Sequence, residues 1–298
     1  MEATQGRSVN RLLVTGSTGM LGSALVAELA KDPASPQVLP YGRDRLDLRY
    51  PDGVRQVILR ERPDVVVNCA GWTAVDDAEA HEVDALAVNG NGVRALALAC
   101  EDLGARLFHI STDYVFDGTA GGPYAEYHPV APVNAYGRTK LAGERAVLEV
   151  LPERGYVVRT AWLYGASGRN FVQTMIALER TRDTVEVVDD QFGQPTWTGD
   201  LAAQLVRLTR ADSPPGVYHA TSSGQATWYD LAREVFMLLG ADPGRVRRTG
   251  SAAFLRPAAR PAYSVLGHDR WAAAGMSPMR HWREALHAAW PSMVGGHA

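Results

Sequence analysis

The sequence predicts an α/β fold, a doubly wound parallel sheet of the Rossmann type with a smaller C-terminal lobe. Three observations predict it. Short apolar runs alternate with segments of helical periodicity through the first half of the chain, a pattern typical of parallel strands joined by crossover helices. A glycine-rich turn follows the first apolar run. Past residue 162 the alternation loosens, as expected where a second lobe begins.

The elements of the first half follow from their apolar spacing. Apolar runs predict buried strands over 11–15, 37–41, 64–70, 105–111 and 155–159. Helical spacing predicts helices over 20–30, 53–60, 83–103 and 135–150. Pro63 stops the second helix, and Gly104 ends the third. Because doubly wound sheets bind ligands beyond the carboxyl ends of their strands, the residues that follow these strands are candidates for a site.

The second half is expected to contain helices over 170–180, 201–210 and 228–239 and strands over 184–188 and 216–220. Gly193 and Pro195 predict a turn or loop over 191–196, and residues 247–267 are rich in Arg, Pro and Ala with little periodicity. We therefore assign residues 1–162 to the Rossmann domain and 163–298 mainly to the smaller lobe. Part of 184–220 is expected to add to the Rossmann domain.

Composition narrows the classes of function. The chain has 298 residues, 46% of them hydrophobic, and a formal net charge of −3, so its overall field favours no nucleic-acid partner. No apolar run is long enough for a membrane helix, and residues 1–10 lack the apolar core of a signal peptide. Cys69 and Cys100 form no CxxC pair and are expected as reduced, packed thiols. These features predict a cytoplasmic protein without a membrane segment or a zinc framework.

The turn after the first strand has a glycine at every third position, Gly16, Gly19 and Gly22. The first allows a tight turn, the second lets a pyrophosphate approach the backbone, and the third lets the helix pack on the strand. The helix N-terminus offers free N–H groups to that anion. A glycine-rich turn without a ligand is the alternative, but its place between a strand and a helix favours a dinucleotide. The expected contacts are Gly16, Thr18, Gly19, Met20, Leu21 and Gly22.

Arg43 follows the second strand, where a site for NAD usually has an acidic residue for the ribose hydroxyls. An arginine there can pair with a 2′-phosphate, which favours NADPH and leaves NADH possible; a solvated loop arginine is the alternative. Asp47 and Leu48 are expected beside the adenine. Cys69, Ala70 and Gly71 follow the next strand and are expected beside the cofactor, because they are small.

Tyr136 and Lys140 lie four residues apart on a predicted helix and so project from one face. A free phenol has a pKa of about 10, and a nearby ammonium favours the phenolate and lowers that pKa. Thr112 follows the strand over 105–111 and could hydrogen-bond the same carbonyl oxygen. Alone, such a Tyr–Lys pair is more often a surface pair. With the glycine-rich turn and Thr112, it predicts a site that protonates an alkoxide as hydride arrives.

Together these residues resemble the extended short-chain dehydrogenase/reductase superfamily. Five segments are also similar to the dTDP-4-dehydrorhamnose reductase family within it: Asn68–Glu79, Ile110–Gly118, Pro132–Glu144, Arg159–Tyr164 and Asp190–Thr196. The resemblance extends over residues 11–270. It implies NADPH-dependent reduction of the C4 keto group of a dTDP-4-keto-6-deoxyhexose, in this family dTDP-4-dehydrorhamnose, which gives dTDP-L-rhamnose.

The resemblance also implies residue roles. Thr112, Tyr136 and Lys140 would be the catalytic triad, and Lys140 would also bind the nicotinamide ribose. Tyr114 and Trp162 would contact the sugar, and Asn170 and Arg260 would lie near the nucleotide or the phosphates. The implied substrate-binding residues are Thr112, Asp113, Tyr114, Tyr136, Trp162, Asn170, Gln194 and Arg260.

Two comparisons within the superfamily limit the interpretation. The related nucleotide-sugar dehydratases carry Asp-Glu after the catalytic Thr, whereas this chain has Asp113-Tyr114, so dehydration is not expected. Some rhamnose-type members carry an acidic residue after the third glycine and use it in a metal-bridged dimer. This chain has Ser23 there, so we expect no metal, and a monomer or a homodimer.

Three other functions stay open. They are a 4-ketoreductase for another dTDP-deoxysugar of secondary metabolism, a nucleotide-sugar epimerase that keeps its NAD bound, and a non-catalytic, NADP-binding regulatory subunit. The complete set of Thr112, Tyr136 and Lys140 disfavours the last.

Several conspicuous residues are expected to be structural. His109 is expected to be a satisfied core residue, and Asp76 and Asp77 a helix start. A solvated basic face is expected for Arg245, Arg247 and Arg248, and packing roles for Trp72, Trp197, Trp228, Trp271, Trp282 and Trp290.

Overall fold

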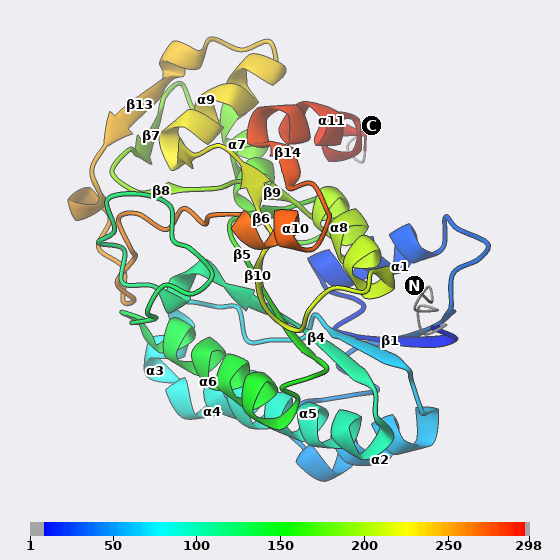
Figure 1. The fold of residues 1–298 in the computed structure, drawn as a ribbon. Helices are drawn as coiled ribbons and strands as arrows, with labels where there is room; N and C mark the ends of the chain where they lie inside the picture. Colours follow the sequence, from blue (N-terminus) through cyan, green and yellow to red (C-terminus); the bar gives the residue numbers. More distant parts are fainter. Residues whose placement is uncertain (1–8, 296–298) are drawn as a thin grey trace.

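The computed structural model describes residues 9–295 and has the expected α/β architecture (Figure 1). Six parallel strands form the central sheet in the order β2-β1-β3-β4-β5-β10. Their bounds are β1 Arg11–Thr15, β2 Gln37–Tyr41, β3 Val65–Asn68, β4 Arg106–Thr112, β5 Gly155–Thr160 and β10 Gly216–His219. The order runs from β1 to β2 in one direction and from β3 to β10 in the other. The carboxyl ends of β1 and β3 therefore border the crevice where such sheets bind ligands.

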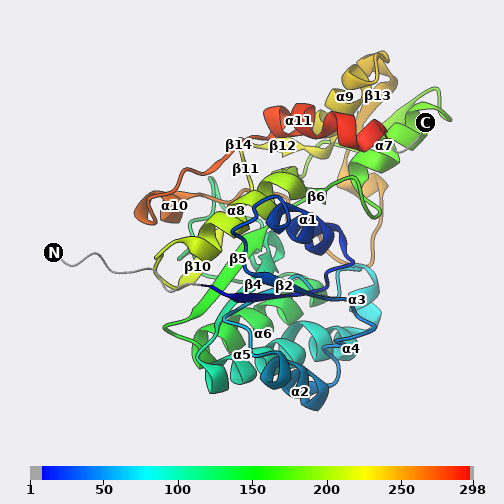
Figure 2. The same cartoon turned by 90° about the vertical axis from the view of Figure 1, so that its right-hand side faces the viewer.

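Helices cover both faces of the sheet (Figure 2). One face carries α1 (Met20–Leu29) and α8 (Thr198–Arg210); the other carries α2 (Pro51–Glu61), α5 (Gly92–Leu103) and α6 (Ala135–Val150). Successive side chains of a strand point to opposite faces. Leu12 and Val14 accordingly pack with α1 and α8, whereas Leu13 packs with α2 and α5. Because both faces are buried, the strands are apolar without alternation.

The expected strands and helices of the first half are present, apart from one interruption. The helix expected over 83–103 consists of α4 (Glu82–Leu86), a π-helical turn (Ala87–Asn91) and α5. The side chain of Asn89, in the π-helical turn, is buried and bonds the backbone N–H and carbonyl of Trp72 at 2.8 and 3.0 Å. This tie to the loop after β3 accounts for the interruption, since single π turns are typical of sites where a helix accommodates a special contact.

The smaller lobe has a core of its own. It contains α7 (Phe171–Glu179), α9 (Trp228–Leu238), α11 (Trp282–Val294) and the parallel strands β7 (Val185–Val188) and β13 (Val246–Thr249). Later segments also form α10 (Asp269–Ala273), β11 (Ser222–Ser223) and β14 (Met279–His281), whereas the short helix α3 (Asp77–Ala80) follows β3.

One expectation about this lobe is wrong. The segment 191–196 is not only a loop: β8 (Phe192–Gly193) pairs with β12 (Ala226–Thr227), and β9 (Thr196–Trp197) pairs with β6 (Leu163–Tyr164). In addition, β13 extends into the stretch 247–267, where little periodicity gave no reason to expect a strand. Strands of two residues are too short for a periodic pattern, and their distant partners hold them in place.

The two parts of the chain interleave. Helix α8 and strand β10 come from beyond residue 162 but belong to the sheet layers, and Trp271 of α10 packs into the same core. The division at residue 162 stays a prediction. Cys69 and Cys100 are free thiols. Within residues 9–295 we find no helix with the length and apolarity needed to cross a membrane.

Candidate active site

Two adjoining cavities lie along the carboxyl edge of the sheet. The first, of about 470 Å³, lies beyond β4 and β5. The second, of about 430 Å³, lies beyond β1 and β2. Their shared wall follows β1 and β3 and consists of Gly19, Cys69, Ala70, Gly71 and Thr73. This is the position that the strand order favours for a ligand.

The glycine-rich turn forms one end of the second cavity. Gly16 has φ +60°, which glycine tolerates, and lines the cavity together with Thr18 and Gly19. No side chain caps α1 at Gly19, so the first N–H groups of the helix can face an anion. Met20 and Leu21 line the first cavity.

Gly22 lines neither cavity. A Cβ at this position would lie 2.1 Å from the Gly16 carbonyl oxygen. Its role is therefore the close packing of the turn on the helix, and not direct contact with a ligand.

Arg43, Asp47 and Leu48 lie at the other end of the second cavity. The Arg43 side chain is 71% exposed, and its guanidinium lies 3.5 Å from Asp47. Asp47 bonds mainly with Arg49, at 2.6 Å, which lowers the pKa of Asp47 to about 2. Arg43 thus keeps most of its hydrogen-bonding capacity for a ligand.

Thr112, Tyr136 and Lys140 meet at the wall of the first cavity. Thr112 is the last residue of β4, and the other two lie near the start of α6. Asn134 caps this helix by accepting a 2.8 Å hydrogen bond from the Gly137 N–H, and the Thr112 hydroxyl lies close enough to Tyr136 to affect the pKa of its phenol. A strand and the helix packed on it therefore hold all three side chains.

The expected effect of Lys140 on the phenol is not present. Burial raises the pKa of Tyr136 to about 12, and the nearby Thr112 hydroxyl opposes this rise. Lys140 Nζ instead donates to the Ile110 carbonyl at 2.6 Å and lies 3.3 Å from His109 Nε2. Burial also lowers the pKa of Lys140 to about 8. The phenol is thus a protonated donor at neutral pH, and the lysine titrates close to neutrality.

His109 is a buried core residue, as expected, and borders Lys140. Asn68 Nδ2 lies 2.9 Å from His109 Nδ1, and the Ala70 N–H, which can only donate, lies 3.2 Å from Asn68 Oδ1. Burial and then the charge of Lys140 lower the pKa of His109 well below its usual range. A neutral imidazole therefore borders the lysine.

Aromatic side chains form the rest of the first cavity. The ring of Tyr114, just after β4, meets the ring of Tyr136 edge to face, with centroids 6.0 Å apart. Trp162 has φ +46° and stacks on Trp228 with centroids 3.6 Å apart. Both tryptophans line the cavity. Trp228 thus packs on Trp162, as expected of a packing residue, and also lines the cavity; this contact depends on tertiary structure and has no local signal.

Three residues that the resemblance placed at the substrate line neither cavity. Asn170 caps α7 by accepting from the Gln173 N–H at 3.0 Å. The amide of Gln194 is buried and bonds both the N–H and the carbonyl of Leu266, at 2.8 and 3.1 Å. Arg260 bonds Asp76.

Sequence reasoning missed other lining residues of the first cavity: Thr73, Val75, Ile110, Ser111, Thr160, Ala161 and Leu163. Each lies shortly after β3 or at the end of β4 or β5, so the rule about carboxyl ends could have found them. Asp76 and Asp77 lie at the start of α3 as expected, but the Asp76 side chain makes no capping hydrogen bond. Arg245 and Arg248 pair with Glu179 and Asp189. In the described part of the chain, no group of three His, Cys, Asp or Glu side chains could hold a metal ion.

Comparison with known proteins agrees with this geometry. A family model described as the RmlD substrate binding domain matches residues 10–294. A dTDP-4-dehydrorhamnose reductase of Streptomyces griseus is 57% identical over 96% of this chain and 94% of its own. A dTDP-4-keto-6-deoxy-D-glucose reductase of Streptomyces niveus is 56% identical over 95% of this chain and 97% of its own. The crystal structure of dTDP-4-dehydrorhamnose reductase from Bacillus anthracis in complex with NADP has a TM-score of 0.90 at 36% identity, covering 95% of this chain and 99% of that one.

Proposed function

The chain belongs to the RmlD substrate binding domain family, and we propose from this premise that it reduces the C4 keto group of dTDP-4-dehydrorhamnose with NADPH, giving dTDP-L-rhamnose. One observation carries the proposal: a protonated phenol, a threonine hydroxyl and a lysine meet in one cavity that adjoins a second cavity with an uncapped helix N-terminus. The relatives are named as reductases of dTDP-4-keto-sugars.

The residues present fit NADPH. The uncapped N-terminus of α1 would hold the pyrophosphate, and Arg43 would pair with the 2′-phosphate. At Gly71 a Cβ would lie 3.2 Å from Asn89 Oδ1 and 3.9 Å from Lys140 Nζ, so larger residues would fill the join between the cavities. Bound NADPH supplies the hydride.

The protein's own residues handle the proton. The Tyr136 hydroxyl, protonated because burial raises its pKa to about 12, donates to the carbonyl oxygen as negative charge develops there. The Thr112 hydroxyl, which donates to Asp113 Oδ1 at 3.0 Å, can turn to the same oxygen. Lys140 lies one helical turn after Tyr136 and does not lower the pKa of its phenol, so we assign its ammonium to the nicotinamide ribose of the bound cofactor.

We also propose how the chain divides this work. Residues 1–162, with α8 and β10, form the NADP-binding domain, and the rest of 163–298 forms mainly the substrate-binding lobe. The free thiols of Cys69 and Cys100 support a cytoplasmic location. Because every named group comes from a single chain, the mechanism is the same for a monomer and a homodimer.

Replacement of Tyr136 by Phe tests the mechanism. The variant loses the proton donor but keeps the aromatic packing, so we expect kcat to fall by about 100- to 10,000-fold while the Kd for NADPH stays unchanged. Stopped-flow absorbance of NADPH gives kcat, and cofactor fluorescence gives the Kd. Wild-type turnover in Tyr136→Phe would rule out the assignment.

A panel of substrates tests the sugar. NADPH oxidation is followed with dTDP-4-dehydrorhamnose and dTDP-4-keto-6-deoxy-D-glucose, and the C4 configuration of each product is determined. We expect the highest kcat/KM with dTDP-4-dehydrorhamnose. A preference for the other sugar would move the protein to deoxysugar reduction in secondary metabolism. Turnover by copurified NAD without added NADPH would indicate an epimerase.

A further inference from the structure

A strap, residues 256–267, joins the smaller lobe to the sheet domain beside the first cavity (orange in Figure 1). On the lobe side, the Phe192 N–H donates to the Ala262 carbonyl at 2.8 Å. On the sheet side, Asn134 Nδ2 donates to the Ala259 carbonyl at 2.8 Å. Asn134 also caps α6, two residues before Tyr136. The strap is therefore bonded directly to the start of the helix that carries the proton donor.

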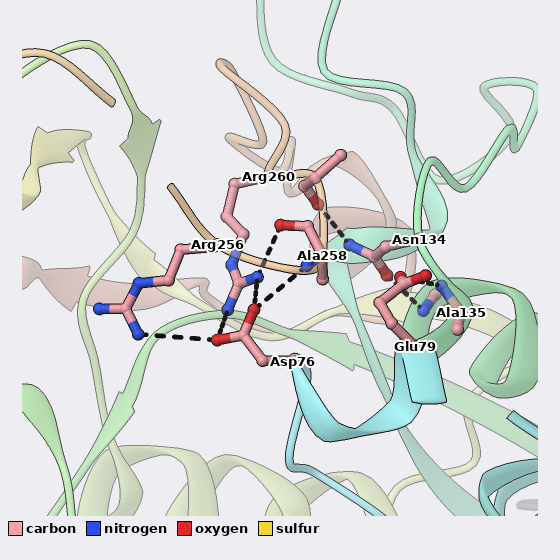
Figure 3. A network of polar contacts seen from close by, with 9 residues as sticks. Asp76, Glu79, Asn134, Ala135, Arg256, Ala258 and Arg260 are labelled. Carbon is pink, nitrogen blue, oxygen red and sulfur yellow. Dashed lines mark hydrogen bonds and ion pairs between the residues drawn. The ribbon is translucent and has the colours of Figure 1, made fainter. Parts of the chain in front are cut away.

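An ion pair fixes the strap to the loop after β3 (Figure 3). Arg260 binds the Asp76 carboxylate with both terminal nitrogens, at 2.5 and 3.0 Å. The same carboxylate accepts from the Ala258 N–H at 3.2 Å and pairs with Arg256 at 3.6 Å. The side chains of Asp76 and Arg260 are only 30% and 19% exposed. We call this Asp76–Arg260 pair the latch.

The latch reaches the cavity through one aromatic residue. Arg260 lies close enough to Tyr114 for its charge to oppose the rise that burial causes in the pKa of that phenol, and the ring of Tyr114 meets the ring of Tyr136 edge to face. Asp76, Arg260, Tyr114 and Tyr136 are thus successive neighbours from the strap to the proposed proton donor. Arg260 itself does not line the cavity, and one of its terminal nitrogens also donates to the Ala258 carbonyl at 2.8 Å.

We propose that Asp76 and Arg260 are positioning residues: the latch holds the strap and sets Tyr114 against Tyr136, so that a sugar bound in the first cavity meets an ordered wall. This inference rests on the proposed function for the identity of the sugar. It differs from the role that the resemblance implied for Arg260, because three of the five guanidinium N–H groups already donate to Asp76 and Ala258.

The two roles predict opposite signs for Asp76→Asn. If Arg260 binds the substrate diphosphate directly, Asp76 competes with that anion, and its neutralisation lowers the KM for the sugar nucleotide. If the latch positions Tyr114, the same change loosens the strap, and the KM rises. Asp76 lines neither cavity, so NADPH binding reports on neither role.

The experiment compares wild type, Asp76→Asn, Asp76→Glu and Glu179→Gln. We expect the KM for dTDP-4-dehydrorhamnose to rise roughly tenfold in Asp76→Asn, with the Kd for NADPH unchanged and partial recovery in Asp76→Glu. Glu179→Gln is the matched control, because it breaks a 2.7 Å pair of similar exposure inside the smaller lobe. Arg260→Gln is measured alone and together with Asp76→Asn. The KM of the double variant should be no higher than that of the more impaired single variant. An unchanged or lower KM in Asp76→Asn would overturn the inference.

Hydrogen exchange separates this inference from the proposed function. Loss of the latch frees the Ala258 amide, so peptides covering 256–260 should exchange faster in Asp76→Asn than in wild type or Glu179→Gln. Unchanged exchange would overturn the latch whatever the activity. If the wild type oxidised NADPH with neither sugar, the proposed function would fail, and the exchange result would still decide whether the latch exists.

Discussion

Asp113 lies just after β4 with its carboxylate buried between two hydroxyl groups. Thr112 donates to Oδ1 at 3.0 Å, and Ser264 of the strap donates to Oδ2 at 2.5 Å. Burial nevertheless raises the pKa of Asp113 from 3.8 to about 6. A group whose pKa is raised on folding contributes its full stabilisation at pH values below its pKa in the unfolded chain. This contribution is lost as the pH rises through its pKa in the folded protein. At neutral pH the ionised Asp113 therefore destabilises the fold, by about 3 kcal/mol relative to acid.

Asp113→Asn should remove this pH dependence. The amide has nearly the same shape and can still bond both hydroxyls, but it does not titrate. We expect the free energy of unfolding of the variant, relative to wild type, to increase by about 1 kcal/mol between pH 5 and pH 8. Urea denaturation at both values measures it, with the surface variant Asp102→Asn as control. A difference that does not change with pH would contradict the prediction.

Arg43 decides the cofactor in our proposal. Within residues 9–295 its exposed guanidinium pairs only with Asp47, at 3.5 Å, and it lines the second cavity. Arg43→Ala should therefore raise the KM for NADPH roughly tenfold and leave the KM for NADH almost unchanged. The control is Arg45→Ala: Arg45 donates to the Pro40 carbonyl at 3.1 Å and stacks on Tyr41. An equal loss with both cofactors would show that Arg43 does not contact the 2′-phosphate.

For single residues, the sequence could identify site residues that directly follow a strand, and few others. Thr112 and Ala70 are examples, because the carboxyl ends of parallel strands share one edge. The contacts of Trp228 and Asp76 have no signal in the local sequence, because their partners, Trp162 and Arg260, lie far away in the chain. Asp76 and Arg260 are 184 residues apart, and local spacing has no information on such a pair.

At the scale of elements, long buried strands and amphipathic helices were predictable because their patterns repeat several times. Helix α6 has the bounds expected from its spacing, Ala135–Val150. The π turn in the third helix was not predictable, because the apolar spacing continues through it and the cause is the bond between Asn89 and Trp72. The strap has neither helix nor strand periodicity, and its conformation follows from contacts with both parts of the molecule.

Elements also explain why the proton donor is well placed. The backbone of α6 approaches the turn after β4 so closely that a Cβ at Gly137 would lie 2.1 Å from the Tyr114 carbonyl oxygen. Asn134 and the Glu79 carboxylate bond the first turn of the helix, at 2.8 Å each. Tyr136 is thus held by the cap at Asn134 and by the close approach of α6 to the turn after β4. The strap that the latch fixes is bonded to the same end of the helix. This rigidity suits a group that must meet a carbonyl oxygen in one geometry.

For the whole molecule, the order of elements in the chain and the order of layers in space differ. One face of the sheet is covered by α1 together with α8, and Leu201, Leu205 and Leu208 of α8 are completely buried against Leu12 and Val14. The edge strand β10 adds Tyr218, on which Trp271 of α10 packs. A boundary at residue 162 therefore separates the cofactor-binding residues from side chains that complete their core.

This arrangement predicts that residues 1–162 do not fold alone. Removing the rest of the chain takes α8 from one face of the sheet, which then keeps only α1 over Leu12, Val14 and Val158, and leaves β5 as an unpaired edge. The apolar area that remains buried is then too small for a stable core. We expect the fragment to lack a cooperative thermal transition by circular dichroism, to bind 8-anilinonaphthalene-1-sulfonate and not to bind NADPH. The full chain is the control, with a melting temperature that rises on adding NADPH. A fragment with a sharp transition and NADPH affinity would show that the first 162 residues form an independent domain and that α8 and β10 are dispensable for it.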